Sequence, residues 1–351
     1  MTRPGSWVQW VQWVRDRLGE RGLAVAVLVG LVALGSIPLV ALPAVRCEVF
    51  GGGCREPAPE VRADPVSAPG KQLTPVESAT WGSYLALGDS YSAGVGAEAS
   101  AADQNPLERC HRTSKAYYHE VSKAFPFPKG TSFWACSGAT TADVRGGRHG
   151  EPSQLGRIGA DTSLITMSVG GNDIGFSKVV AGCVVKLPFS GSCTRQGGDI
   201  AGKMSDLRRN LPYLIAEVHG RAPRARIIMM GYPKAFSEVR GTGGDNISVP
   251  EQQWLNARAY DLGQLIRQTA VEADARIVTR REQGSVEFVD AYSAFAGHEV
   301  GSSDPYMNGL ALNLSALQAE ATSYHPTANG QHALAGLFIE QIKKGPGRPV
   351  S

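Results

Sequence analysis

The chain has 351 residues, which is enough for one α/β domain of average to large size with extensions. Its formal net charge of +3 is too small to indicate a nucleic-acid partner, and no basic run is interleaved with aromatic residues. Hydrophobic residues make up 42% and charged residues 19%, as in a globular protein with some membrane-like sequence added.

One long apolar segment lies near the N-terminus. Residues 22–45 carry no charge and are bracketed by Arg21 and Arg46, and about 20 apolar residues suffice to cross a bilayer. Arginines outnumber acids before this segment, which places residues 1–21 in the cytoplasm by the positive-inside rule. The alternative is a cleaved signal peptide, but the apolar run is longer than a typical signal core and no clean cleavage site follows. We favour a transmembrane anchor at 22–45, and in either case the rest of the chain is exported.

The region that follows the anchor reads as a spacer. Residues 46–80 are rich in proline and glycine and have no apolar period, so they cannot bury enough surface to fold. We expect a Pro/Gly-rich stalk at 46–80, a globular domain at 81–345 and a short C-terminal tail at 346–351.

Six cysteines lie beyond the anchor, and export makes disulfides their default state. Of the fifteen pairing schemes that six cysteines allow, we favour Cys47–Cys54, Cys110–Cys136 and Cys183–Cys193. A metal site is the alternative, but no CxxC pair or Cys/His cluster supports it. A lipid-modified Cys47 is a further alternative, which Arg46 directly before it disfavours.

Short apolar runs alternate with helical patterns from residue 84 onward. Strands are expected at 84–87, 131–136, 164–169, 226–230 and 286–289. Apolar residues at helical spacing predict helices over about 204–218 and 254–271, and a last helix is expected over about 329–343. Such a pattern indicates a parallel sheet covered on both faces, in which functional residues gather at the carboxyl ends of the strands.

Two side chains are candidates for nucleophilic catalysis. Ser90 ends Gly88-Asp89-Ser90 directly after the first strand, and His325 lies in the loop before the last helix. A serine hydroxyl is a weak nucleophile until a base accepts its proton, and an imidazole can do so. Each residue alone has a simpler interpretation, because Gly-Asp-Ser can be a plain turn and a loop histidine is usually a surface residue. The two become persuasive only together with their partners.

Two further residues could stabilise an oxyanion. Asn172 follows the third strand within Gly170-Gly171-Asn172-Asp173, and Gly138 follows the second. An asparagine amide and a close backbone N–H are suitable donors to a tetrahedral intermediate, and each is worth about 2.7–4 kcal/mol by precedent. The N–H of Ser90 would be a third donor. The alternative is that Gly138 is a turn glycine and Asn172 a turn or cap residue. We interpret Asp89 and Asp173 as structural loop acids.

These motifs together resemble the SGNH (GDSL) hydrolase family over nearly all of 81–345. The resemblance rests on Gly88-Asp89-Ser90-Tyr91-Ser92-Ala93-Gly94, Gly138, Asn172 and His325-Pro326, in that order. It implies a flavodoxin-like α/β/α sandwich with a central parallel sheet, and ester hydrolysis through serine with no metal or organic cofactor. Cys136-Ser137-Gly138-Ala139-Thr140, the Cys183/Cys193 pair and Phe295-Ala296-Gly297-His298 are similar to the secreted lipase and esterase branch of actinobacteria.

The chain departs from that family in the residue that orients the histidine. Family members often carry an aspartate three residues before it, where this chain has Thr322. Losing the acid of a Ser-His-Asp triad can cost about 10⁴ in turnover, because the imidazole adopts the wrong tautomer. A main-chain carbonyl holds the imidazole in some relatives, so we expect the carbonyl of Thr322 to do so here. Asp304 is a less favoured substitute.

The sequence therefore predicts a membrane-tethered, extracytoplasmic serine esterase or lipase that acts through an acyl-enzyme intermediate. Its substrate is expected to be a lipid or an acylated envelope glycan, and the protein is expected to be a monomer. Two alternatives remain open. An acyltransferase acting on envelope glycans or lipids would use the same residues, and a non-catalytic surface protein could retain the same fold.

Overall fold

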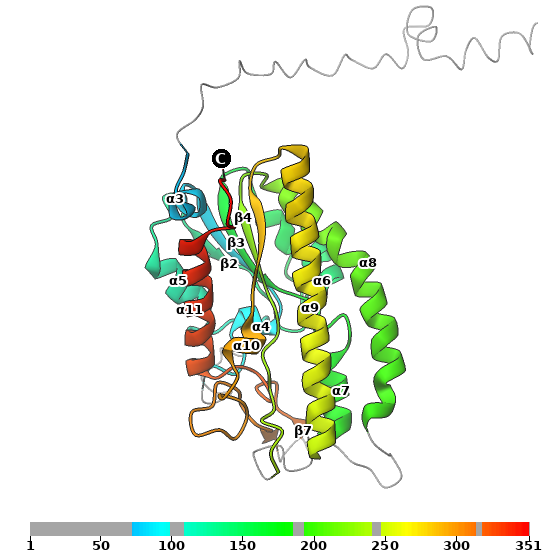
Figure 1. Ribbon diagram of the computed structural model, residues 1–351. Coiled ribbons are helices and arrows are strands. Elements are labelled where there is room, and N and C mark those ends of the chain that lie inside the picture. The colour runs from blue at the N-terminus through cyan, green and yellow to red at the C-terminus, as the bar shows by residue number, and fades with distance from the viewer. Residues whose placement is uncertain (1–71, 99–108, 185–192, 241–246, 314–317, 351) are drawn as a thin grey trace, which may run out of the picture. The chain divides into compact units, whose positions relative to one another are not determined.

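Five strands form a parallel sheet in the order β2-β1-β3-β4-β5 (Figure 1). The computed structural model describes residues 72–98, 109–184, 193–240, 247–313 and 318–350. The strand order is that of flavodoxin-like folds, whose ligands bind beyond the carboxyl ends of the strands. The strands are β1 (Ser83–Gly88), β2 (Thr131–Phe133), β3 (Thr162–Ser168), β4 (Arg226–Met230) and β5 (Ser285–Val289).

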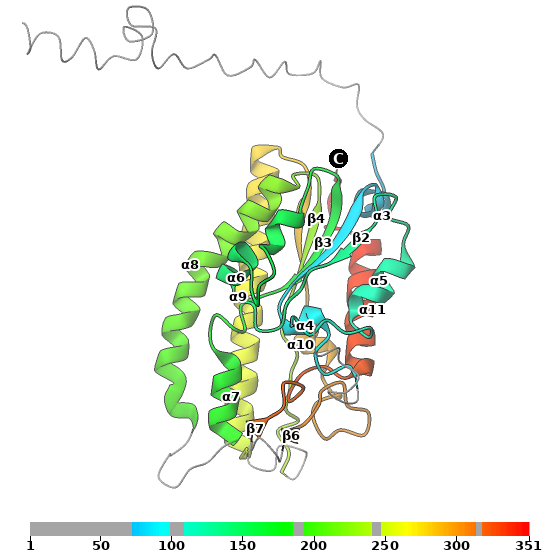
Figure 2. The ribbon, with the colours of Figure 1, turned by 180° about the vertical axis from the view of Figure 1, so that it is seen from behind.

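Most strands of this sheet are buried on both faces because helices cover both. All seven residues of β3 are buried. Within β1, Tyr84 and Ala86 belong to one hydrophobic cluster, whereas Leu85 and Leu87 belong to the other. The helices α3 (Pro75–Thr80), α5 (Tyr117–Ala124) and α11 (Ala328–Lys344) pack on the first face, and α6 (Thr141–Gly146), α8 (Gly197–Arg221) and α9 (Val249–Arg280) on the second (Figure 1, Figure 2). The predicted parallel sheet between two helical layers is confirmed.

Several shorter elements lie among these layers. They are the helices α4 (Ser90–Ala93), α7 (Phe176–Val184) and α10 (Ala291–Ala294), the 3-10 turns η2 (Gln154–Arg157) and η3 (Cys193–Gln196), and the antiparallel pair β6 (Leu312–Asn313) and β7 (Gln318–Ala319). The helix α4 is drawn below β2 and β3 in both views, at the end of the sheet where β1 ends (Figure 1, Figure 2).

Several boundaries differ from those that the sequence predicts. The helices α8 and α9 extend beyond the expected 204–218 and 254–271 at both ends, and two further differences bear on the architecture. The strand expected at 131–136 ends at Phe133, because the next two backbone N–H groups, of Trp134 and Ala135, both donate to the carbonyl of Ala86. This doubled contact interrupts the regular ladder with β1. The fold also begins before residue 81, since the last residues of the expected stalk form α3. Thr74 caps this helix, and Ser163 Oγ donates to the carbonyl of Ala79 at 2.8 Å.

Some expectations fall outside the described residues. They are the anchor at 22–45, most of the stalk, and the Cys47–Cys54 disulfide. In the ranges that the structure describes, no helix combines the length and the hydrophobicity that a membrane span requires.

A buried ion pair joins the sheet to α11 and α3. Arg226 is fully buried on β4 and forms a bidentate pair with Glu287 on β5, with N–O distances of 2.8 and 2.7 Å. The guanidinium also donates to the carbonyls of Pro75, Ile342 and Gln341. A buried charge is costly unless it is paired and hydrogen-bonded, so these contacts must remain together in the folded state.

We predict that Glu287→Gln lowers the free energy of unfolding by about 3–5 kcal/mol, because it leaves the Arg226 charge buried and unpaired. Denaturant unfolding measures this loss. Glu340→Gln is the matched control, since the Glu340 side chain is 74% exposed, and its effect should stay within about 0.5 kcal/mol. A loss below about 1 kcal/mol for Glu287→Gln would contradict the structural role of the pair.

Candidate active site

The strand ends bring the predicted site residues to one cavity. Its volume is about 560 Å³, and Ser90, Gly138, Asn172 and His325 all line it. Ser90 lies two residues after the end of β1, Gly138 follows β2, and Asn172 follows β3, so three neighbouring strands position them. His325 comes from the loop before α11, far along the chain.

A sharp turn between β1 and α4 presents Ser90. Gly88 has φ of 114°, and a Cβ there would lie 2.1 Å from the carbonyl oxygen of Ser168, so only glycine fits. Gln154 fixes this glycine by accepting from its N–H at 2.7 Å and donating to its carbonyl at 3.0 Å. Asp89 caps α4 by accepting from the N–H of Tyr91 at 3.0 Å. Ser90 is the first residue of α4, so its own N–H has no partner within the helix.

The imidazole of His325 lies between a hydroxyl and a carbonyl. Its Nε2 is 2.7 Å from Ser90 Oγ, and its Nδ1 is 3.1 Å from the carbonyl oxygen of Ser323. A carbonyl can only accept, so Nδ1 carries the hydrogen and Nε2 is left to accept from Ser90. Burial lowers the pKa of His325 to about 4, and the Ser323 carbonyl partly opposes this shift. The imidazole is therefore neutral at pH 7.

The orienting carbonyl is that of Ser323, not that of Thr322 as the sequence led us to expect. The carbonyl of Thr322 instead accepts from the backbone N–H of His325 at 3.2 Å. Tyr324, between them, has φ of 57°, a left-handed conformation that is uncommon for a residue other than glycine. Asp304, the less favoured substitute, contacts His298: its carbonyl oxygen is 2.8 Å from His298 Nδ1.

Two side chains that the sequence analysis did not single out hold the histidine loop. Asn308 donates from Nδ2 to the carbonyls of Gly96 at 2.8 Å and His325 at 3.1 Å. Tyr91 donates from its hydroxyl to the carbonyl of Tyr324 at 2.9 Å, and its ring centroid is 5.0 Å from that of His325. Tyr91 stands inside the first motif, so its position offered a signal, whereas nothing in the sequence around Asn308 did.

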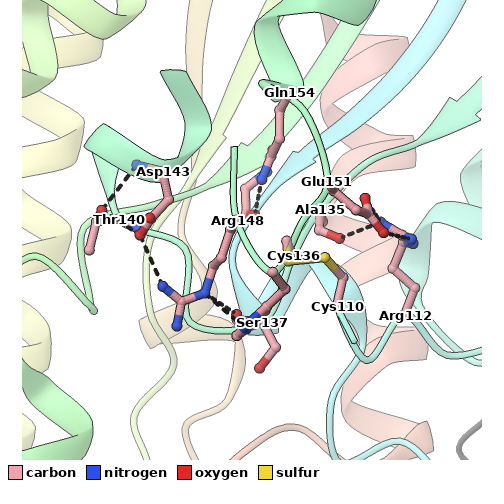
Figure 3. The surroundings of a disulfide bond; sticks show 12 residues. Cys110, Arg112, Ala135, Cys136, Ser137, Thr140, Asp143, Arg148, Glu151 and Gln154 are labelled. Atoms are coloured by element: carbon pink, nitrogen blue, oxygen red, sulfur yellow. Dashed lines mark hydrogen bonds and ion pairs between the residues drawn. A yellow bond between two sulfur atoms is a disulfide. The ribbon is translucent and has the colours of Figure 1, made fainter. Parts of the chain in front are cut away.

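The loop that carries Gly138 is braced from two sides (Figure 3). Cys136 is joined to Cys110 by a disulfide, and the N–H of Ser137 donates to the carbonyl of Cys110 at 2.9 Å. On the other side, Arg148 Nε donates to the carbonyl of Ser137 at 3.0 Å. Gly138 has φ of 76°, a left-handed conformation that favours glycine.

The turn that carries Asn172 is tied to the same loop. Asn172 Nδ2 donates to the carbonyl of Ala139 at 3.0 Å, and a primary amide has a second hydrogen to donate. Asp173 accepts from Thr141, from both the backbone N–H at 3.1 Å and Oγ1 at 2.5 Å. Burial raises the pKa of Asp173. These contacts agree with the interpretation of Asp173 as a structural loop acid.

The second expected disulfide in the described residues is also present. Cys183, near the end of α7, pairs with Cys193 at the start of η3. No group of three or more His, Cys, Asp or Glu side chains among the described residues is arranged to hold a metal ion.

Apolar side chains form much of the rest of the cavity wall. Phe176, Val180 and Val184 project from α7, and Ala235, Phe236 and Leu310 complete this part of the lining. Val180 is 6% exposed and Phe236 only 1%. Such a surface favours a hydrocarbon group over a charged or strongly hydrated one.

The chain matches the model of the GDSL-like lipase/acylhydrolase family over residues 86–333. A lipase of Streptomyces rimosus is 31% identical over 270 residues, which cover 76% of this chain and 85% of that protein. Lipase 1 of Streptomyces coelicolor is 32% identical over 250 residues, covering 71% and 82%. The crystal structure of phospholipase A1 from Streptomyces albidoflavus NA297 aligns with a TM-score of 0.61 and 29% identity, covering 74% of this chain and 99% of that one. The chain therefore belongs to the GDSL-like lipase/acylhydrolase family, and it is a carboxylic ester hydrolase.

Proposed function

We propose that the protein hydrolyses carboxylic esters through a Ser90–His325 dyad and a covalent acyl-enzyme. The observation that carries this proposal is the 2.7 Å contact between Ser90 Oγ and His325 Nε2 at the wall of a cavity with an apolar lining. A nucleophile within hydrogen-bond reach of an oriented, neutral base is the arrangement that covalent catalysis by serine requires.

In the acylation step, Ser90 Oγ attacks the ester carbonyl carbon while its proton passes to His325 Nε2. The imidazolium that forms keeps its Nδ1 hydrogen bond to the Ser323 carbonyl, which stabilises the added charge without a carboxylate. The C–O bond to the alcohol then breaks, and the alcohol leaves with the proton from Nε2. The acyl group remains on Ser90.

The tetrahedral intermediate places a negative charge on the former carbonyl oxygen. The donors proposed for this oxyanion are the N–H groups of Ser90 and Gly138 and the second amide hydrogen of Asn172, all at the same cavity. Ser90 and Gly138 are fixed by the turn at Gly88 and by the braced loop at Ser137. Preorganised donors cost no reorganisation when the charge forms.

Deacylation repeats the step with water as the nucleophile. His325 Nε2 takes a proton from water, the hydroxide attacks the acyl carbon, and the ester bond to Ser90 breaks. Ser90 recovers its proton from His325, and a carboxylic acid is released.

We propose lipid esters as the substrate class. The apolar lining contributed by α7 and by Phe236 suits an acyl chain, and two aligned relatives are described as a lipase and a phospholipase A1. Burial of each methylene of such a chain contributes about 0.8 kcal/mol. A small acetyl group would fill little of the cavity.

The proposed location is outside the cytoplasm, with the segment 22–45 as a membrane tether. Two disulfides and the solved structure of a relative described as an extracellular lipase of Streptomyces rimosus support export.

For purified full-length protein, we predict hydrolysis of p-nitrophenyl esters from acetate to palmitate, with kcat/KM rising with chain length. Ser90→Ala should lower turnover by about 10⁴-fold or more, because nothing replaces the nucleophile. Ser205→Ala, an exposed serine on α8, is the matched control and should leave turnover unchanged. Activity that survives Ser90→Ala would contradict the mechanism. A preference for acetate would contradict the lipid assignment alone.

The pH dependence follows from the pKa of His325. Protonated imidazole cannot accept the Ser90 proton, so kcat/KM should fall as the pH drops through about 4 and stay level above it. Burial raises the pKa of Asp89 to about 6, so a rate profile alone does not identify which group titrates. The protonation of the His325 ring is therefore followed by NMR in parallel, and the His325→Gln variant assigns its signals. A His325 titration near the ordinary histidine value of about 6.5 would contradict the buried, neutral base.

A further inference from the structure

The hydroxyl of Tyr232 touches both of the turns that follow β1 and β3. Tyr232 comes from a third segment, two residues after the end of β4, and its side chain is buried. Its hydroxyl donates to Asp89 Oδ2, next to the nucleophile, and accepts from the N–H of Gly171 at 2.8 Å, next to Asn172. Its donor hydrogen and one acceptor lone pair are thus both occupied.

The ring of Tyr232 is in close contact with both sides of the site. A Cβ on Gly171 would lie 2.9 Å from ring atoms of Tyr232, so the Asn172 turn rests directly on the phenol. The ring also packs edge-on against Tyr91, with 5.0 Å between centroids. Tyr91 in turn lies against His325 and holds the carbonyl of Tyr324.

We propose that Tyr232 is a positioning residue for the oxyanion hole, which fixes the Asn172 turn relative to Ser90. This inference rests on the proposed ester hydrolysis. Asp89 also accepts from Ser168 Oγ at 2.6 Å and from the N–H of Tyr91 at 3.0 Å, so the nucleophile turn keeps two ties without Tyr232. The N–H of Gly171 has the phenol as its partner. The Asn172 turn keeps its contacts with Ala139 and Thr141, but these hold it to the Gly138 loop and not to Asp89. Loss of the hydroxyl therefore removes the link between Gly171 and Asp89, and a displacement of about 1 Å can cost about 10²-fold in rate.

Tyr232→Phe tests this role, because it keeps the ring and removes the hydroxyl. We expect kcat per active site to fall by about 10- to 100-fold and KM to change by less than about 2-fold, since the oxyanion donors act mainly on the transition state. The affinity for an alkyl boronic acid, which forms a tetrahedral adduct with the serine, should fall in parallel with kcat. Active sites are counted by titration with a fluorophosphonate.

The control is Tyr213→Phe, the same change at a residue on α8 that is 67% exposed, and it should match the parent protein. Gly171→Ala is a second variant, because its methyl group pushes the turn away from the phenol with the hydroxyl intact. It should also lower kcat per active site and the boronate affinity.

Unchanged kcat per titrated site in Tyr232→Phe would overturn the inference. So would a loss confined to the fraction of titratable sites, or failure of both variants to fold, since either outcome indicates a role in the fold alone. The parent protein separates the two proposals. If it neither hydrolyses esters nor reacts with the fluorophosphonate, the proposed function fails, whereas a fully active Tyr232→Phe variant refutes only the positioning role.

Discussion

The parallel pairing of β1 with β3 is the constraint on which the site depends. Its register sets Gly88 opposite Ser168, and the N–H of Asp89 extends the ladder by donating to the carbonyl of Ser168. The strands β1 and β3 end at the same level of the sheet, so Ser90 and the Gly170–Asp173 turn lie side by side. Closer approach depends on Gly88, where any side chain would collide with the backbone of β3. The backbone pairing and the steric limit at Gly88 therefore set the relative position of these two turns.

Buried polar groups convert this placement into a rigid arrangement. Asp89 is held by Ser168, Tyr91 and Tyr232, and Ser168 Oγ lies 2.8 Å from Ser92 Oγ. Each of these groups is removed from water, so the loss of a hydrogen bond here costs more free energy than the loss of one at the surface. The network therefore strongly favours a single geometry. Asp89 directs its carboxylate into this network. It therefore supports the neighbouring Ser90 through these contacts and does not act on the reacting atoms itself.

Much of this arrangement could be predicted from local sequence. Runs such as Leu164–Val169 are buried throughout and mostly apolar because both faces of the sheet are covered, and the motifs follow such runs. The contact between His325 and Ser323 could not be predicted, because any residue supplies a carbonyl and only the left-handed conformation of Tyr324 selects which one. Tyr232 and Asn308 were also missed. Tyr232 lies 143 positions from Asp89, and Asn308 lies 212 positions from Gly96. No local sequence pattern encodes such contacts.

The central claim is that the acyl group is transferred to Ser90. A rapid-quench experiment tests this claim directly. The full-length protein is mixed with a p-nitrophenyl ester and quenched in acid within milliseconds, and the mass of the intact chain is measured by mass spectrometry. The account predicts a mass increase equal to one acyl group, located on the peptide that contains Ser90 and absent from Ser90→Ala. An adduct on a different residue, or ester turnover that survives Ser90→Ala, would contradict it.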